Sequence, residues 1–180
     1  MQQELTGSHA AALNHRPPRL AALWYTTLGW AVLPMSRTHD GECRCPKGSA
    51  CPCAGPHPLV PTGPGAPTTN SATVRAWWAT WPWAQVGVAT GAPSALLVLE
   101  TSHDHDPELP PTWTMSAGTR SWRFYHHPPT RGLPRPALPD ACTVHGEGRV
   151  VMVPPALIDG ARARWLPGPQ QLATLPTPAR

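Results

Sequence analysis

The sequence is poor in lysine, isoleucine and phenylalanine, which occur once each, at Lys47, Ile158 and Phe124. Arginine and proline are abundant by contrast: 13 of the 14 basic residues are arginine, and 26 residues are proline. We interpret this imbalance as codon bias toward Ala, Arg, Pro and Gly rather than as a chemical signal. Long basic runs are absent and the formal charge is only +4, so the composition permits contact with nucleic acid without arguing for it.

Other absences exclude whole classes of protein. No apolar run approaches the ~20 residues of a membrane-spanning helix, and the first residues lack the basic-then-apolar pattern of a secretory signal. The sequence contains no serine-hydrolase elbow, Walker loop or dinucleotide-binding fingerprint. We therefore expect a cytoplasmic protein with no membrane partner.

A chain of 180 residues fits one domain with a modest core. Prolines gather in the loops and toward both ends of the chain. We expect a disordered leader over residues 1–18, one folded domain over residues 19–166 and a mobile Pro-rich tail over residues 167–180. Internal repeats are absent.

Apolar periodicity and turn residues predict an α+β fold. Helices are expected over residues 19–28, which Gly29 ends, and 72–81, which Pro82 ends. The expected strands are residues 30–34, 85–90, 95–101, 112–116, 122–126 and 149–153, with residues 144–148 as a hairpin arm and turn before the last. Leu96–Leu99 is apolar without alternation, so both faces of its strand should be covered. The order of elements favours mixed or antiparallel pairing.

Four cysteines and a histidine lie within fifteen positions, as Cys43-x-Cys45-x5-Cys51-x-Cys53-x3-His57. Thiolates and imidazole at such spacing suit tetrahedral Zn²⁺. The intervening residues have no core of their own, and a metal holds such a loop because its binding free energy becomes folding free energy. Disulfides or free thiols are the alternative. We favour zinc, because no secretory signal is visible. Five candidate ligands for four places leave one spare.

Six further motifs and the two parts of the Cys/His segment follow one another in order along the chain. They are Trp24-Tyr25-x3-Gly29-Trp30-x-Val32-x-Pro34, Cys43-x-Cys45, Cys51-x5-His57-Pro58, Ala66-Pro67-Thr68-Thr69, Val74-Arg75-Ala76-Trp77-Trp78-x2-Trp81-Pro82, Val86-Gly87-Val88-Ala89-Thr90-Gly91, Leu96-Leu97-Val98-Leu99 and Gly148-x-Val150-Val151-x-Val153-Pro154-Pro155. With these motifs, residues 20–155 resemble the bifunctional DNA primase–polymerase N-terminal domain of the archaeo-eukaryotic primase superfamily.

The resemblance implies a small α/β unit joined to a mixed or antiparallel sheet like that of an RNA-recognition module. It implies synthesis of primers and DNA from nucleoside triphosphates with a divalent metal, Mg²⁺ or Mn²⁺. It also implies a zinc loop over residues 43–57 whose ligands are Cys43, Cys45, Cys51 and His57. Relatives often carry serine at the position of Cys53, which is therefore the spare residue.

The catalytic positions depart from the family pattern. Phosphoryl transfer to a growing strand uses two metal ions ~4 Å apart, held by carboxylates. The family provides an Asp-x-Asp after the strand equivalent to Leu96–Leu99 and a third aspartate on a later strand. Here the three positions hold Glu100, Ser102 and Thr143. At most one anionic ligand remains, so Mg²⁺ affinity should collapse.

Neighbouring carboxylates offer partial compensation. Asp104 and Asp106 alternate just past the strand and, with Glu100, form the only carboxylate set near the expected centre. A solvated loop before a proline is the other interpretation of that segment, and the one we favour. Asp140 and Glu147 are further options on the later segment, each shifted from the expected place.

Five residues are candidates for nucleotide binding: Ser116, Gly118, Arg120, Trp122 and His145. Trp122 stands where relatives carry a histidine that meets the triphosphate. It either stacks on a base or fills an abandoned pocket, and we favour the second. Arg120, together with Arg123 and Arg131, would line a nucleotide groove, although arginines on an exposed sheet edge are equally expected.

We therefore predict a primase/polymerase-like domain with impaired catalysis, whose partners are single-stranded DNA or primed template and nucleoside triphosphates. Three alternatives remain. The first is a catalytically dead zinc module that binds nucleic acid or a protein partner not identifiable from sequence. The second is an active nucleotidyltransferase that uses Glu100 with Asp104 and Asp106. The third is a decaying gene product with no retained role.

Overall fold

A computed structural model describes residues 6–39, 42–53, 55–61, 66–102, 108–126 and 142–175. Several residues with predicted roles lie outside these ranges, namely Asp104, Asp106, Arg131 and Asp140. Their roles remain predictions. The described residues form an α+β fold with two principal sheets, as the sequence predicts. In the described part of the chain, no helix is long and apolar enough to cross a membrane.

Helices α2 (Pro18–Thr27) and α3 (Ser71–Thr80) match the two predicted helices within one residue. Proline suits the first turn of α2, where the missing N–H would have no partner in any case. Gly29 follows the helix with a φ of 80°, a conformation that glycine adopts without strain. Asn70 caps α3, because its side-chain oxygen accepts hydrogen bonds from two first-turn N–H groups at 2.9 and 3.1 Å.

Every predicted strand is present, with its ends shifted by no more than two residues. The described strands are β1 (Val32–Met35), β2 (Thr38–His39), β3 (Glu42–Cys43), β4 (Gln85–Ala89), β5 (Leu96–Ser102), β6 (Trp113–Ala117), β7 (Arg120–His126), β8 (Thr143–His145), β9 (Val150–Met152), β10 (Leu157–Ile158), β11 (Ala161–Arg162), β12 (Arg164–Trp165) and β13 (Ala173–Thr174). A short 3₁₀ helix, η1 (Gly48–Ala50), follows β3.

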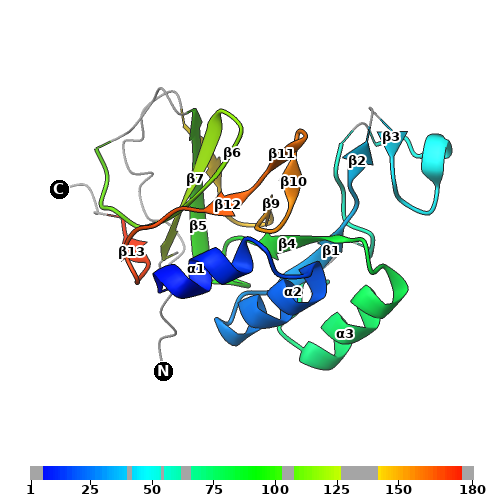
Figure 1. Ribbon diagram of the computed structural model, residues 1–180, viewed down its shortest axis with the longest axis horizontal. Helices are drawn as coiled ribbons and strands as arrows, with labels where there is room; N and C mark the ends of the chain where they lie inside the picture. Colours follow the sequence, from blue (N-terminus) through cyan, green and yellow to red (C-terminus); the bar gives the residue numbers. More distant parts are fainter. Residues whose placement is uncertain are drawn as a thin grey trace.

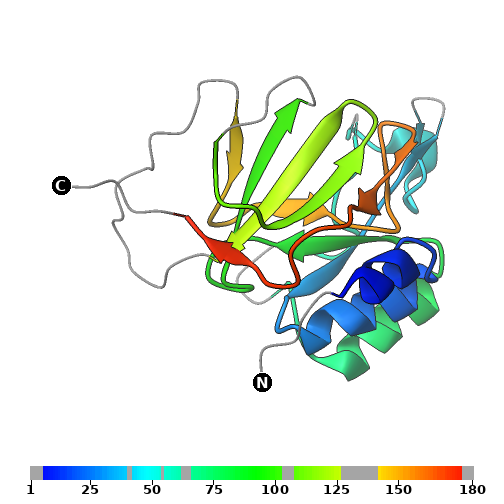
Figure 2. The same ribbon diagram turned by 60° about the vertical axis from the view of Figure 1, so that its left-hand side comes forward.

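The strands form a small sheet in the order β1-β4-β9 and a large one in the order β12-β6-β7-β5-β8, with β13 added to β7. All pairs are antiparallel except β13 with β7. The small sheet lies between helices α2 and α3 on one side and the large sheet on the other (Figures 1 and 2). Hairpins β2–β3 and β10–β11 each form a separate two-stranded sheet.

An aromatic cluster joins the helices to the large sheet. The Trp30 ring stacks on Tyr25 at 5.6 Å between centroids and on Phe124 at 5.7 Å. Trp165 contacts all three rings, and its indole N–H donates to the Tyr25 hydroxyl at 2.7 Å. Burying these large apolar side chains stabilises the packing of the helices on the large sheet.

The chain between β8 and β9 does not form the predicted hairpin. β8 pairs with β5 in the large sheet, whereas β9 pairs with β4 in the small sheet. The segment 146–148 therefore carries the chain from one sheet to the other, and that prediction is wrong. The Gly-rich pattern does mark a sharp change of direction, since Gly148 has a φ of 70°.

Segments near both ends of the described chain contact the domain. Helix α1 (Gly7–Leu13) buries Ala10 and Leu13 in the core. The buried Asn14 side chain exchanges two hydrogen bonds with the backbone of Trp165, at 2.7 and 3.1 Å. At the other end, β13 pairs with β7. The physical reason is that these short segments complete surfaces formed by distant parts of the chain, which local composition does not reveal.

Candidate functional site

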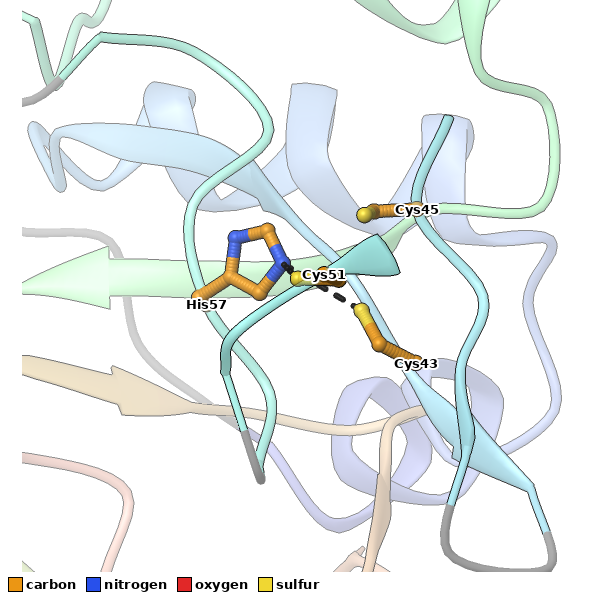
Figure 3. A group of neighbouring side chains, drawn as sticks. All are labelled: Cys43, Cys45, Cys51 and His57. Atoms are coloured by element: carbon orange, nitrogen blue, oxygen red, sulfur yellow. Dashed lines mark hydrogen bonds between the residues drawn. The ribbon is translucent and has the colours of Figure 1, made fainter. Parts of the chain in front are cut away.

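The Cys/His loop brings four possible ligand atoms together (Figure 3). The three Sγ atoms of Cys43, Cys45 and Cys51 and the ring nitrogen of His57 all lie within 4.8 Å of one another. The Nε2 atom of His57 is 3.3 Å from the Sγ of Cys43 and 3.4 Å from that of Cys51. These are the four residues selected from the sequence, and the fifth candidate, Cys53, is exposed.

The arrangement fits a tetrahedral metal ion. Ligands placed at ~2.0–2.3 Å from one ion lie ~3.3–3.8 Å from each other, which matches the close sulfur-to-nitrogen distances here. The other ring nitrogen of His57, Nδ1, is 2.8 Å from the carbonyl oxygen of Pro58. That contact keeps the proton on Nδ1 and leaves the Nε2 lone pair directed toward the thiols. The cluster can therefore hold a metal ion.

Local electrostatics differ among the thiols. Burial raises the pKa of the Cys43 thiol. Burial opposes ionisation at Cys45 too, but the backbone N–H of Lys47, 3.4 Å from its sulfur, and the neighbouring cluster side chains lower the pKa of Cys45 to about 6. Thiolate is the metal-binding form of cysteine, so this environment prepares at least one ligand.

The Cys/His loop (residues 43–57), called the metal loop below for the ion it can hold, is attached to the small sheet through Ser36, which follows β1. The Ser36 N–H donates to the carbonyl of His57 at 2.7 Å, and the His57 N–H donates to the Ser36 hydroxyl at 2.9 Å. A backbone bridge between Met35 and Pro58 continues the pairing. One ligand is thus held against a rigid strand, while the three cysteines lie in the hairpin and the turn after it.

The second candidate centre lies at the end of β5. Glu100 and Ser102 are two residues apart on one strand and point to the same side. Thr143 of β8 lies directly opposite Glu100 in the antiparallel register. Side chains at directly opposite positions have Cβ atoms only ~5 Å apart. The three positions expected to carry catalytic carboxylates therefore share one face, although only Glu100 carries a charge.

Both carboxylate oxygens of Glu100 are already engaged. The Arg120 guanidinium donates to Oε1 at 2.8 Å, and the Nε2 atom of His145 lies 2.8 Å from Oε2. The Glu100 side chain is only 16% exposed. Hydrogen bonding to His145 lowers the pKa of the Glu100 carboxyl, burial works against that effect, and Arg120 lowers the pKa further. Glu100 is therefore ionised near neutral pH, and the Arg120 guanidinium compensates its charge.

Arg120 also bonds Asp159, in the turn between β10 and β11. Asp159 was not selected from the sequence. An Asp-Gly pair between two short apolar segments is a hairpin signal, so the turn was detectable. The contact with Arg120 was not, because it joins segments 39 residues apart.

Trp122 lies opposite Glu100 on β7 and is 3% exposed. It belongs to the main core cluster, and the Arg120 guanidinium carbon lies 5.3 Å from its ring centroid. A base has no room to stack on a ring so enclosed. The role of Trp122 as the filling of a former pocket stays a prediction.

The remaining candidates are dispersed around this centre. Ser116 is half-buried on β6, and Gly118 is exposed in the β6–β7 turn with a φ of 57°. Glu147 accepts a hydrogen bond from the Ala92 N–H at 2.9 Å, after β4 rather than beside Glu100. Arg123 points to the opposite face of β7 from Arg120, since the two are an odd number of residues apart.

Comparison with known proteins gives one positive result. Residues 22–178 match the model of the family described as bifunctional DNA primase/polymerase, N-terminal. No curated protein and no solved structure matches significantly.

Proposed function

The chain belongs to the bifunctional DNA primase/polymerase N-terminal family, and from that premise we propose that it is a nucleic-acid-binding relative with impaired nucleotidyl transfer. The observation that carries this proposal is the state of Glu100. Its two oxygens are occupied by Arg120 and His145, and the neighbouring positions Ser102 and Thr143 bring no negative charge.

Electrostatics make this centre unfavourable for paired divalent cations. Two such ions need several carboxylates to offset their charge. At ~4 Å and an effective dielectric constant of ~20, a divalent cation and a guanidinium repel by roughly 8 kcal/mol. Arg120 is 38% exposed, so solvent weakens this repulsion, but the interaction stays unfavourable. A metal ion at Glu100 would have to compete with Arg120 and His145 for the carboxylate oxygens.

The Cys/His cluster supports a retained binding role. We propose that Cys43, Cys45, Cys51 and His57 hold Zn²⁺, because three thiolates and one imidazole are its usual ligands in closed structural sites. With all four places taken by protein atoms, the metal would order the loop and would not activate water. Zinc binding at this site would fix hairpin β2–β3 against the small sheet.

Primer extension tests the impairment directly. Purified zinc-loaded protein is incubated with primed template, labelled nucleoside triphosphates, and Mg²⁺ or Mn²⁺. We expect no extension above that of Glu100→Ala, while the protein still retards single-stranded DNA in a mobility-shift assay. Extension that disappears in Glu100→Ala would overturn the proposal and favour an active transferase that recruits Asp104 and Asp106.

A further inference from the structure

A cavity of about 180 Å³ lies away from Glu100 and is lined by three arginines. They come from distant parts of the chain: Arg16 from the turn before α2, Arg37 from the link between β1 and β2, and Arg162 from β11. The half-buried Trp83, after α3, contributes an aromatic side chain to the same wall. Such convergence does not arise from a local basic run in the sequence.

The three guanidinium groups have no counter-charge in the part of the chain that the structure describes. No hydrogen bond or ion pair joins Arg16, Arg37 or Arg162 to another described side chain, and no carboxylate lines the cavity. Cations that share one wall repel one another, so the cavity favours an anion. Arginine forks match the oxygens of phosphate especially well.

The wall of this cavity is fixed by a buried polar contact. The Gln85 side chain on β4 is 6% exposed, and its amide bonds both the N–H and the carbonyl of Leu157, the latter at 3.2 Å. Leu157 in turn pairs with Arg162 across the β10–β11 hairpin. Arg162 therefore stands on a backbone that is tied to the small sheet, which limits the reorganisation that binding would require.

The size of the cavity argues for a single chemical group. Pockets that enclose a whole small molecule usually measure ~300–1,000 Å³. A volume of about 180 Å³ suits one phosphate, with the rest of its parent molecule lying outside. Phosphate-binding arginines beside an aromatic ring are the combination that proteins use for single-stranded nucleic acid.

The cavity also lies between the two sites described above. Hairpin β10–β11 stands between the large sheet and hairpin β2–β3 (Figure 1). Arg162 belongs to that hairpin, and Asp159 at its turn bonds Arg120 beside Glu100. On the other side, the carbonyl of Arg37 accepts a hydrogen bond from Arg44 of the metal loop at 2.9 Å.

We propose that Arg16, Arg37 and Arg162 bind a backbone phosphate of a single nucleic-acid strand, which passes along hairpin β10–β11 between the metal loop and the Glu100 centre. This inference rests on the proposed nucleic-acid-binding function and assigns it a place on the surface. A free nucleoside triphosphate offers the same phosphate chemistry, so the experiment has one arm for each source.

The test uses Arg37→Gln and Arg162→Gln, which keep an uncharged polar head, and Arg75→Gln as the matched control. Arg75 is exposed on α3 and lines no part of the cavity. Fluorescence anisotropy measures binding of a labelled oligothymidylate over a range of salt concentrations, and separately of a labelled nucleoside triphosphate. Thermal melting verifies that each variant is folded. Both arginines are exposed, so neither substitution should disturb the fold, and either variant alone can test the site.

Each cavity variant should weaken oligothymidylate binding about tenfold, the effect of losing one charge-assisted hydrogen bond. The slope of log affinity against log salt should fall by about 0.7 per lost phosphate contact, while Arg75→Gln leaves the affinity near wild type. Wild-type affinity in both variants would overturn the site while leaving nucleic-acid binding intact. Loss of triphosphate binding alone would overturn the assignment to a strand. Absence of wild-type oligothymidylate binding would overturn both proposals.

Discussion

Replacing Glu100 by glutamine removes the negative charge at the end of β5 while keeping the shape of the side chain. In the wild-type protein the Glu100 carboxylate accepts from Arg120 and contacts His145, both at 2.8 Å. The variant retains an amide oxygen for one of these contacts. The substitution should therefore lower the free energy of unfolding mainly by removing the charge on the Glu100 carboxylate.

The expected cost follows from the exposure of the three side chains. A hydrogen bond to a charged group contributes ~1.5–3 kcal/mol, and exposed ion pairs contribute ~0–1 kcal/mol. Glu100 is 16% exposed and His145 20%, but Arg120 is 38% exposed and solvent screens its share. We expect a loss of about 1–2 kcal/mol near neutral pH, which for a chain of this size lowers Tm by roughly 3–6 °C.

The pH dependence provides a sharper signature. The pKa of Glu100 in the folded state is lowered, so its stabilisation is fully present above the ordinary glutamate value of ~4.3 and is lost as pH falls through the folded value. Urea unfolding at several pH values should show wild type and Glu100→Gln converging below pH ~4. Release of metal by acid affects both proteins alike and cancels in the difference.

A matched control is Glu108→Gln, which neutralises an exposed carboxylate in the segment before β6. This control should unfold like the wild type at every pH. If Glu100→Gln behaves like the control, or is more stable than wild type near neutral pH, then the contacts of the carboxylate with Arg120 and His145 do not stabilise the fold as described.

Three other perturbations address the rest of the molecule. His57→Ala should reduce bound zinc from near one per chain to near zero, whereas Cys53→Ser should retain it. Elemental analysis of the purified variants measures the zinc content. The reverse pattern would show that the ligand set is wrong. Trp122→Ala should lower the free energy of unfolding in urea by about 3–5 kcal/mol, as large core truncations do, without changing nucleoside triphosphate affinity. Unchanged stability with weakened nucleotide binding would instead favour base stacking. Asn14→Ala should lower the free energy of unfolding in urea by about 1–3 kcal/mol, because it leaves backbone groups of Trp165 buried without partners. Unchanged stability would mean that the first residues do not pack on the domain.

Helices α2 and α3 and the longer strands were predictable because their signals are local, whereas α1 and the short strands β2, β3 and β10–β13 were not predicted. Pro18, Gly29 and Asn70 mark helix ends through backbone geometry and capping that involve neighbouring residues only. The apolar run at Leu96 predicts a strand covered on both faces, and three of its first four residues are buried. The metal cluster was predictable for the same reason, since a short loop limits how far its ligands can lie from one another.

The contacts that define the Glu100 centre were not predictable in the same way. Arg120 is 20 residues from Glu100 in the sequence, His145 is 45, and Asp159 follows in a different hairpin. Only the pairing of β5 with β7 and β8 brings Arg120 and His145 to Glu100, and Asp159 reaches Arg120 from a separate hairpin. The Gly-rich segment before β9 shows the limit of local patterns, because its turn residues were evident but the partner strands on either side were not.

A Mn²⁺ titration tests most directly whether Glu100 has lost its role as a metal ligand. The zinc-loaded protein is titrated in the presence of a nucleoside triphosphate and single-stranded template, and electron paramagnetic resonance measures the bound Mn²⁺. We expect titrations of wild type and Glu100→Gln to be indistinguishable, with no stoichiometric protein-bound Mn²⁺ beyond that held by the triphosphate alone. A tight site that fills in the wild type and disappears in Glu100→Gln would contradict the account.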